Sequence, residues 1–285
     1  MCNSNLTMIP RSFAIYDFNL ITFLVMGLDT DGPLGEGTGY RNDQQMDFVT
    51  VLSFNPLDHT YTAMHLNRDS IVEIDELGVT GEQTGYSYKA QLALAHTYGN
   101  GGNLSCLNAK RAVSRMLYGL KIDYYVALSM DAISTLNDYV GGVPVTMPKD
   151  YTALDPAFVE GESVTLRGDQ ALLYVRSRKD TDDQTNLSRM ERQKQYIDGF
   201  VKKIAALDIN DDFTKGAYDA VMEPSYMMTD AGLAPIKGLM EDLKNYTFKG
   251  CVSPEGIAKV GEEYMEFYVN EDSLVSLVTD LYFEK

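Results

Sequence analysis

Tryptophan is absent from this 285-residue sequence, and only three cysteines and three histidines occur in it. Cys2, Cys106 and Cys251 show no Cys-x-x-Cys spacing and the histidines are scattered, which argues against a structural zinc site. Two alternatives remain for Cys106 and Cys251: they pair if the protein sits outside the cell, or they stay separate thiols. Tyrosine is abundant, with 19 residues available for stacking and polar contacts.

Basic residues are scarce. The 24 lysines and arginines stand against 41 aspartates and glutamates, which gives a net charge of −17. Sequence-independent nucleic-acid binding and adhesion to an anionic membrane through a basic surface both need positive charge, so the composition excludes them. The same acidity, without a basic helix-turn-helix face, argues against a transcription regulator.

Long hydrophobic runs are also missing. No stretch reaches eighteen apolar residues, and the best candidate, residues 21–28, has the length of a strand. The first twenty residues lack the basic and apolar segments of a signal peptide. We therefore expect residues 1–20 to be an N-terminal segment without a recognisable membrane helix, followed by a single domain over residues 21–285.

Strand and helix patterns alternate along the chain, which predicts an α/β fold around a central sheet. Strand patterns cover residues 21–28, 48–54, 61–66, 124–128, 143–147 and 264–269. Helical patterns cover residues 88–98, 105–117, 130–139, 189–207, 211–221, 231–243 and 274–282. The glycine-rich stretch at residues 31–39 lacks the lysine-serine ending of a P-loop, so we expect a loop of another kind.

Against its acidic background, the chain gathers arginines in one short region. These are Arg167, Arg176, Arg178, Arg189 and Arg192. A planar guanidinium matches phosphate or carboxylate in bidentate fashion. The cluster therefore predicts a discrete anionic ligand, with phosphate as the first candidate.

The first part of this region reads as a strand. Residues 171–175 are apolar strand formers, and a continuing strand would project Arg176 and Arg178 from the same face. A polar loop is expected over residues 179–187.

A helix is expected to follow that loop. Ser188 and Glu191 have capping-box spacing, so we expect the helix to begin at Ser188. Arg189 and Arg192 then share one helical face. Because the first turn of a helix already favours anions, a cation placed there suggests that a bound anion compensates it.

An alternative without a ligand stays open for the arginines. The same window contains four acidic residues, Asp180, Asp182, Asp183 and Glu191. The arginines and these acids would then form a solvated network of surface ion pairs, which are individually weak.

Two aspartates stand at strand ends in the first third of the chain. Asp29 follows the strand of residues 21–28, and Asp47 precedes the next strand. Mg²⁺ prefers a few carboxylates together with phosphate oxygens and water. The pair is therefore a candidate magnesium site if it converges with the arginines, and otherwise each residue serves a turn or a cap.

From residue 21 to about 205, the chain contains a series of ordered motifs. The most specific is Leu166-x-Gly168-x-Gln170-Ala-Leu-x-Tyr174-x-Arg176-x-Arg178, followed by Arg189-x-x-Arg192-Gln193. The others are Phe23-Leu-Val-Met-Gly-Leu-Asp29, Asp47-Phe-Val-Thr-Val-Leu-Ser-Phe-Asn-Pro56, His65-Leu-Asn-Arg68-Asp69-Ser70, Lys89 with Ala95-His-Thr-Tyr-Gly99 and Gly101-Gly102, Ile122-Asp-Tyr-Tyr-Val126 and Val140-Gly-Gly-Val143. Each motif is weak alone, but in their order and spacing the chain resembles the LytR-CpsA-Psr family.

The resemblance implies an α/β/α sandwich with a central mixed sheet and a long apolar cavity. It implies a Mg²⁺-dependent phosphotransferase that moves a glycopolymer, such as teichoic acid or capsule, from a polyprenyl-pyrophosphate carrier to peptidoglycan or another envelope acceptor. Hydrolysis of the pyrophosphate would be a side activity. The implied location is extracytoplasmic, with the membrane surface reached through the lipid substrate.

The resemblance also implies roles for individual residues. The pyrophosphate-binding set comprises Arg68, Arg176, Arg178, Arg189, Arg192 and Gln193, the last two supporting the cluster. Within it Arg68, Arg176 and Arg178 are implied as catalytic, because they would stabilise charge on the leaving phosphate. Asp29 and Asp47 are implied as Mg²⁺ ligands. Asp69 is either the base for the acceptor hydroxyl or an ion-pair partner that aims Arg68.

Four apolar residues are candidates for the lipid cavity. They are Leu92, Leu94, Val113 and Leu117, for each of which ordinary core packing is the alternative.

The sequence departs from the family pattern at two points. Gln45 stands where many relatives have arginine, and Arg41 or Arg68 would compensate. The chain also lacks the N-terminal membrane helix usual in relatives. These departures keep a second function open, a non-catalytic module that binds a polyprenyl phosphate or another polyanion in the same pocket.

Overall fold

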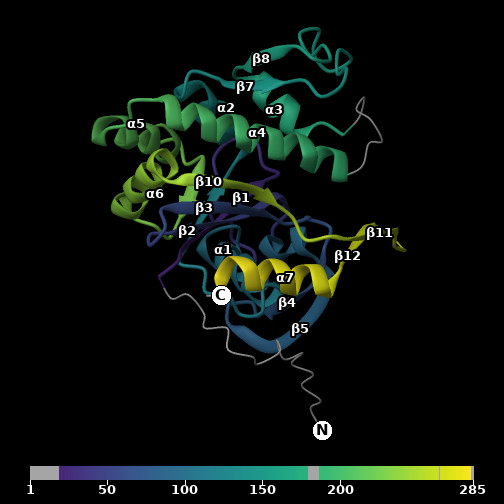
Figure 1. Ribbon diagram of the computed structural model, residues 1–285. Coiled ribbons are helices and arrows are strands. Elements are labelled where there is room, and N and C mark those ends of the chain that lie inside the picture. The colour runs from purple at the N-terminus through teal and green to yellow at the C-terminus, as the bar shows by residue number, and fades with distance from the viewer. Residues whose placement is uncertain (1–18, 179–185, 263, 284–285) are drawn as a thin grey trace.

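The computed structural model describes residues 19–178, 186–262 and 264–283. A six-stranded sheet lies between two layers of helices (Figure 1). Its strands, in spatial order, are β10 (Thr247–Val252), β3 (Thr60–His65), β2 (Met46–Asn55), β1 (Ile21–Leu28), β6 (Tyr124–Leu128) and β9 (Met227–Thr229). β1 runs antiparallel to β2 and parallel to β6, so the sheet is mixed. The predicted α/β/α sandwich with a mixed central sheet is confirmed.

Each face of the sheet has its own helical layer (Figure 1). One face is covered by α2 (Met130–Tyr139), α4 (Asn186–Ala206), α5 (Asp211–Met222) and α6 (Leu233–Asn245), with α3 (Asp169–Arg176) packed on α2 and α4. The other face is covered by the 3₁₀ helix η1 (Leu92–Thr97), α1 (Asn103–Met116) and α7 (Glu271–Tyr282).

The strands contribute side chains to the cores on both faces of the sheet, because successive side chains point to opposite faces. In β1, Phe23 packs with the α4 layer, whereas Leu24 and Met26 pack with the α1 layer. β6 behaves in the same way, with Val126 on the α4 side and Ala127 on the α1 side. Both faces of the central strands are therefore apolar, which explains their nearly continuous hydrophobic runs.

In the part of the chain that the structure describes, three two-stranded ribbons surround the sandwich. They are β4 (Ile71–Leu77) with β5 (Gln83–Gln91), β7 (Val143–Thr146) with β8 (Ser163–Leu166), and β11 (Gly256–Val260) with β12 (Met265–Val269). The sequence patterns indicated only β7 and β12 among these strands, and they also missed β9 and β10.

The strand expected at residues 171–175 is wrong, because this segment is helix α3. Gly168 adopts a φ of 47° directly before the helix. Ala171, Tyr174 and Val175 are buried at the i, i+3, i+4 spacing of a helix face. The apolar run is as compatible with a buried helix as with a strand, and packing against α2 and α4 decides the outcome.

The helix expected over residues 88–98 is also wrong in its first half. Tyr88 pairs with Ile74 and Gln91 pairs with Ile71 in the β4–β5 ribbon, so the chain is extended there. Only η1 coils, as a 3₁₀ helix whose first amide, on Leu92, donates to the Ser70 carbonyl oxygen at 2.8 Å.

Helix α4 begins at Asn186, so Ser188 lies inside the helix and does not cap it. Residues 179–185, with Asp180, Asp182 and Asp183, lie outside the described residues, as do Cys2 and residues 1–18.

The helix expected at residues 130–139 is confirmed as α2. α7 is capped by Asn270, whose side-chain oxygen accepts from the Ser273 amide at 3.0 Å. Cys106 and Cys251 are separate thiols, which decides between the two alternatives for this pair. Among the described residues, none of the helices combines the length and apolar character that crossing a membrane requires.

Candidate active site

The two aspartates meet at one edge of the sheet. Leu28 at the end of β1 pairs with Met46 at the start of β2. The Asp29 amide then donates to the Gln45 carbonyl oxygen at 2.8 Å. This contact holds Asp29 beside the stretch that carries Asp47, so the antiparallel pairing of two strands brings both carboxylates to the same place.

Three arginines converge on the Asp47 carboxylate. Arg189 Nη1 lies 2.7 Å from Asp47 Oδ2, and Arg178 Nη2 lies 3.7 Å from the same oxygen. Arg68 Nη1 forms an ion pair with the other oxygen, Oδ1. The three come from α4, from the segment after α3 and from the segment after β3, so the fold assembles a site that no single motif contains.

Burial lowers the pKa values of two arginines in this cluster. Arg189 is only 1% exposed, and burial together with the neighbouring positive charge of Arg178 lowers its pKa to about 9. Burial likewise lowers the pKa of Arg68 to about 10, opposed by Asp69 and reinforced by Arg189 and Arg178. Guanidiniums held so close to one another favour an added anion, because it offsets their mutual repulsion.

Arg176 forms a second, more exposed set of ion pairs beside the Asp47 cluster. Arg176 Nη2, at the end of α3, lies 2.9 Å from Asp29 Oδ1, and its Nη1 lies 3.4 Å from Asp31 Oδ1. Arg178 is also accessible, with 45% of its side chain exposed. The helix that replaces the expected strand thus delivers Arg176 from its C-terminus, with Arg178 two residues beyond.

Arg192 directs its donors at the backbone. Its Nε donates to the Tyr174 carbonyl oxygen at 3.0 Å, and its Nη2 donates to the Ser177 carbonyl oxygen. The buried guanidinium also lies 5.4 Å from the centre of the Tyr151 ring. This geometry fits the supporting role expected for Arg192, because its donors tie α4 to the end of α3.

Asp69 lies behind Arg68. Its Oδ1 is 3.4 Å from Arg68 Nε and accepts from Gln91 Nε2 at 3.1 Å. Neither hollow described below is lined by Asp69. Of the two roles expected for Asp69, this position favours the ion-pair partner that aims Arg68.

Gln45 is linked to the cluster through Arg68. Arg68 Nη2 donates to Gln45 Oε1 at 2.5 Å. Arg41 instead lies over the Tyr98 ring, 4.0 Å from its centre. Of the two arginines expected to compensate for Gln45, Arg68 is therefore the one in contact with it.

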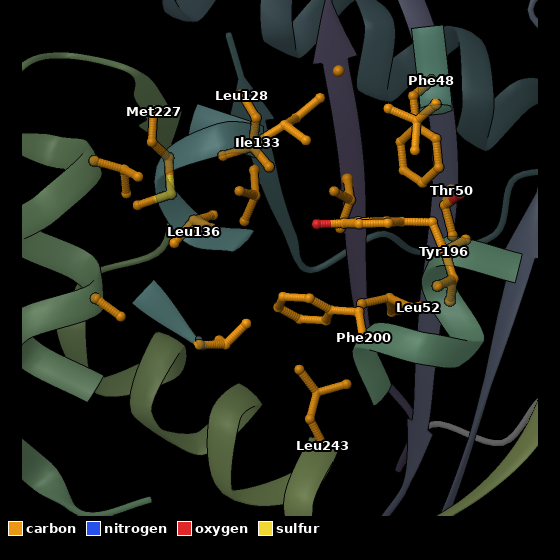
Figure 2. A pocket seen from close by; sticks show the side chains of 18 of the residues that line it. Phe48, Thr50, Leu52, Leu128, Ile133, Leu136, Tyr196, Phe200, Met227 and Leu243 are labelled. Atoms are coloured by element: carbon orange, nitrogen blue, oxygen red, sulfur yellow. The ribbon is translucent and has the colours of Figure 1, made fainter. Parts of the chain in front are cut away.

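An apolar cavity of about 290 Å³ lies between the sheet and the α4 layer. Figure 2 shows Tyr196 and Phe200 of α4 extending into it, opposite Ile133 and Leu136 of α2. Met227 and Leu243 line it from β9 and α6. Asp47, Arg176 and Arg189 also line this cavity, so the charged cluster forms its polar end.

The residues expected to line this cavity lie elsewhere. Leu92, Val113 and Leu117 are buried in the core between the sheet, α1 and α7, and Leu94 packs against that core. Core packing, the alternative for these four, is the correct interpretation. The signal in the sequence that could have identified lining residues is Tyr196 and Phe200, four apart on one face of a predicted helix.

An open groove of about 840 Å³ lies on the outer side of the cluster. Its walls include Asp29, Arg178, Gln170 and Leu173, together with Ala153–Asp155 from the segment after β7. Three residues, Asp47, Arg176 and Arg189, line both the groove and the apolar cavity. The charged cluster is thus the shared wall between an apolar and a polar compartment.

The carboxylates fit a magnesium ion that is completed by substrate. No group of three His, Cys, Asp or Glu side chains suited to a metal occurs in the described part of the chain. Mg²⁺ is commonly held by one or two carboxylates plus substrate phosphates. Asp47 and Asp29 supply such a pair. The Oδ1 atom of Asp47 is buried and faces Arg68 without hydrogen-bond geometry, and the Asp29 carboxylate is half-exposed.

Sequence comparison gives one family match and several relatives. The model of the LytR_cpsA_psr family matches residues 9–274. Biofilm regulatory protein A of Streptococcus mutans is 31% identical over 250 residues, covering 83% of this chain and 58% of that protein. Polyisoprenyl-teichoic acid–peptidoglycan teichoic acid transferase TagU of Bacillus mycoides is 29% identical over 187 residues, covering 65% of this chain and 53% of that protein. The chain thus spans little more than half the length of these two relatives.

Solved structures share the fold. B. subtilis TagT superposes with a TM-score of 0.69 at 19% identity, over 95% of this chain and 93% of that one. TagT bound to LIIa-WTA gives 0.69 at 20% identity, with the same two coverages. Protein gbs0355 of Streptococcus agalactiae gives 0.70 at 24% identity, over 94% and 90%. At these identities the likeness establishes the architecture alone.

Proposed function

The chain belongs to the LytR-CpsA-Psr family, and from this premise we propose that it is a Mg²⁺-dependent phosphotransferase. Its donor is a glycopolymer on a polyprenyl-pyrophosphate carrier, and its acceptor is peptidoglycan or another hydroxyl-bearing polymer of the cell envelope. A relative, TagU, supports this proposal through its name, which describes a transferase of teichoic acid to peptidoglycan.

One observation carries the proposal. Asp47, Arg176 and Arg189 line both the apolar cavity and the outer groove. A polyprenyl-pyrophosphate-linked glycan has the same order of parts, an apolar chain, a pyrophosphate and a hydrophilic polymer. The cavity suits the prenyl chain, the arginines suit the pyrophosphate, and the groove leaves room for the sugars.

The reaction is a displacement at the phosphorus next to the glycan. An acceptor hydroxyl oxygen forms a bond to this phosphorus, while the bridging P–O bond breaks and polyprenyl phosphate leaves. The hydroxyl proton passes to the leaving phosphate or to water. Negative charge grows on the leaving phosphate and on the equatorial oxygens. Arg176, Arg178 and Arg189 stabilise that charge. Arg68, expected to act on the phosphate as well, lines neither hollow and instead holds Asp47 from behind.

Asp29 and Asp47 would hold Mg²⁺, which supplies further stabilisation of the phosphate charge when bound. In the structure these carboxylates pair with Arg176, Arg68 and Arg189. Binding of a pyrophosphate offers the arginines new partners, which releases carboxylate oxygens for the cation. We place the activity outside the cytoplasm, at the membrane surface where the lipid carrier lies.

Phosphate release from farnesyl pyrophosphate, with water as the acceptor, tests this function. The wild type is assayed with Mg²⁺ and with chelator, alongside Arg178→Ala. Metal-dependent release that the substitution abolishes is the expected result. Tight binding without release supports the non-catalytic binding module instead, and absence of both binding and release rejects the proposed site.

A further inference from the structure

Two polar residues at the end of β3 reach across to helix α4. They are His65 and Asn67, which are 1% and 5% exposed. His65 contacts Gln193, and Asn67 contacts Asn186, one turn to either side of Arg189. Neither His65 nor Asn67 lines the apolar cavity or the outer groove.

The His65 contact has a defined direction. Gln193 Nε2 donates to the Val175 carbonyl oxygen at 3.2 Å, so its Oε1 is the atom 3.0 Å from His65 Nε2. With the Gln193 amide in this orientation, His65 Nε2 donates to that oxygen. On the other side of the ring, Nδ1 lies 2.8 Å from Thr50 Oγ1 and 3.1 Å from the Val49 carbonyl oxygen. With the ring proton on Nε2, Nδ1 accepts from the Thr50 hydroxyl.

The neutral ring is the stable form in this position. Burial lowers the pKa of His65 to about 4, and the charges of Lys194 and Arg189 act in the same direction. Both ring nitrogens are thus committed, and the ring connects β2 to α4 through two hydrogen bonds.

The Asn67 contact reaches Arg189 through one intermediate. Asn67 Oδ1 accepts from Asn186 Nδ2 at 2.7 Å and from the Asp69 amide at 2.9 Å. Asn186 Oδ1 in turn accepts from Arg189 Nη2 at 2.6 Å. The side chain of Asn67 therefore organises both the backbone around Arg68 and, through Asn186, the guanidinium of Arg189.

We propose that His65 and Asn67 are positioning residues that fix α4, and with it the Arg189 guanidinium, against Asp47. We call these two residues with Asn186 and Gln193 the β3–α4 clamp. The proposal rests on the proposed function only in taking a pyrophosphate as the ligand of Arg189. Holding a charged donor within a fraction of an ångström of its target has a large effect on both binding and rate.

Farnesyl pyrophosphate binding tests the clamp. His65→Phe keeps a ring but removes both hydrogen bonds, and we expect about tenfold weaker binding, the size of one to two lost hydrogen bonds. Asn67→Ala is expected to weaken binding to a similar degree and supplies the result if His65→Phe does not fold. His65→Gln, which can still donate to Gln193, is expected to recover most of the affinity.

A matched control separates positioning from general stability. Ser53 and Tyr282 form a buried 2.8 Å hydrogen bond between β2 and α7 on the opposite face of the sheet. Tyr282→Phe is expected to lower stability without changing the affinity. Because the clamp acts through Arg189, His65→Phe is expected to add no further loss in an Arg189→Gln background. Unchanged binding in both single variants, or an equal loss in that background, overturns the proposal.

If the wild type does not bind farnesyl pyrophosphate, the proposed function is rejected, but the clamp can still be tested. In that case, urea unfolding of His65→Phe, Gln193→Leu and the double variant decides. The clamp requires that the two substitutions be strongly non-additive, since they share one hydrogen bond. Additive losses overturn it.

Discussion

The two faces of the central sheet both carry apolar side chains, but they differ in how closely these side chains are packed. On the α1 side, Leu24 and Met26 of β1 are covered by a continuous core with α1 and α7. On the α4 side, Val25 of the same strand borders an apolar cavity of about 290 Å³. Unfilled apolar volume costs roughly 2 kcal/mol per 100 Å³. One face thus serves stability, whereas the other gives up stability for a space that a lipid can fill.

The buried polar contacts of the two faces also differ, because those on the cavity face lead to the arginine cluster. On the packed face, the Ser53–Tyr282 hydrogen bond joins β2 to α7. On the cavity face, the His65–Gln193 contact leads to the Val175 carbonyl oxygen, one residue before Arg176. Contacts on this face converge on the arginines at the polar end of the cavity.

The largest effect is expected from an arginine at that polar end. Arg178→Ala removes a guanidinium that is near Asp47 yet half-exposed, so the fold should tolerate it. We expect kcat/KM for phosphate release to fall by about 100-fold or more, because one charge-stabilising donor is lost. Arg167→Ala is the matched control, since Arg167 is exposed and lines neither hollow. Equal effects of the two substitutions would remove the arginine cluster from the reaction.

Acid is expected to weaken both faces through one buried histidine each. Burial lowers the pKa of His65, on the cavity face, and of His96, beside Cys106 on the packed face, to about 4. Because the unfolded pKa is near 6.5, each contributes stability that is fully present above pH 6.5 and is lost as pH falls towards 4. Each histidine accounts for about 3 kcal/mol of that loss.

Urea unfolding at pH 7 and pH 4 measures this dependence. His65→Gln and His96→Gln should each reduce the difference between the two pH values relative to the wild type. A difference that neither substitution changes would mean that the histidines are not held neutral in the folded protein.

A matched pair of alanines tests whether the two faces differ in free volume. Ala217 of α5 lines the cavity, whereas Ala112 of α1 is buried in the packed core. Ala112→Phe should lower the free energy of unfolding by about 1–3 kcal/mol, because no space exists for the ring. Ala217→Phe should change it by less than about 1 kcal/mol, since the ring enters existing space.

Binding assays complete the alanine comparison. Ala217→Phe should weaken binding of farnesyl pyrophosphate but leave inorganic pyrophosphate unaffected, because only the prenyl chain competes with the ring. Equal destabilisation by the two substitutions would show that the cavity is closed in solution.

The smallest effect is expected from a reducing agent. Cys106 is in the packed core and Cys251 is in β10, and both are free thiols. A disulfide between them would contribute about 2–4 kcal/mol. Thermal unfolding with and without reductant should therefore give the same midpoint, and a lower midpoint in reductant would contradict the separate thiols.

Much of the fold could be predicted from local sequence patterns. The helices at residues 130–139 and 211–221 follow from their helical spacing, and the strands at residues 21–28 and 124–128 follow from their runs of strand-forming residues. Residues 171–175 could not be assigned, because a five-residue apolar run has no distinguishing period and its state depends on α2 and α4. The extended conformation of residues 88–91 could not be predicted either, because these residues pair with β4 and no local sequence signal indicates that partner.

The charged part of the site could be predicted because charge stands out against an acidic background. Asp29, Asp47, Arg176, Arg178 and Arg189 all meet at one edge of the sheet. The resemblance implied an apolar cavity, but its lining residues could not be identified, since its walls come from both sheet and helices and each lining residue looks like ordinary core. The clamp residues, such as His65 and Asn67, carry no spacing signal because their partners lie more than one hundred residues away.

The central claim is that the cavity and the arginine cluster form one site for a prenyl pyrophosphate. A crystal structure of the protein with farnesyl pyrophosphate and Mg²⁺ tests it most directly. The account predicts the prenyl chain between Tyr196, Phe200 and the sheet, with the pyrophosphate on Arg176, Arg178 and Arg189. A pyrophosphate bound away from these arginines, or a prenyl chain that lies outside the cavity, would contradict it.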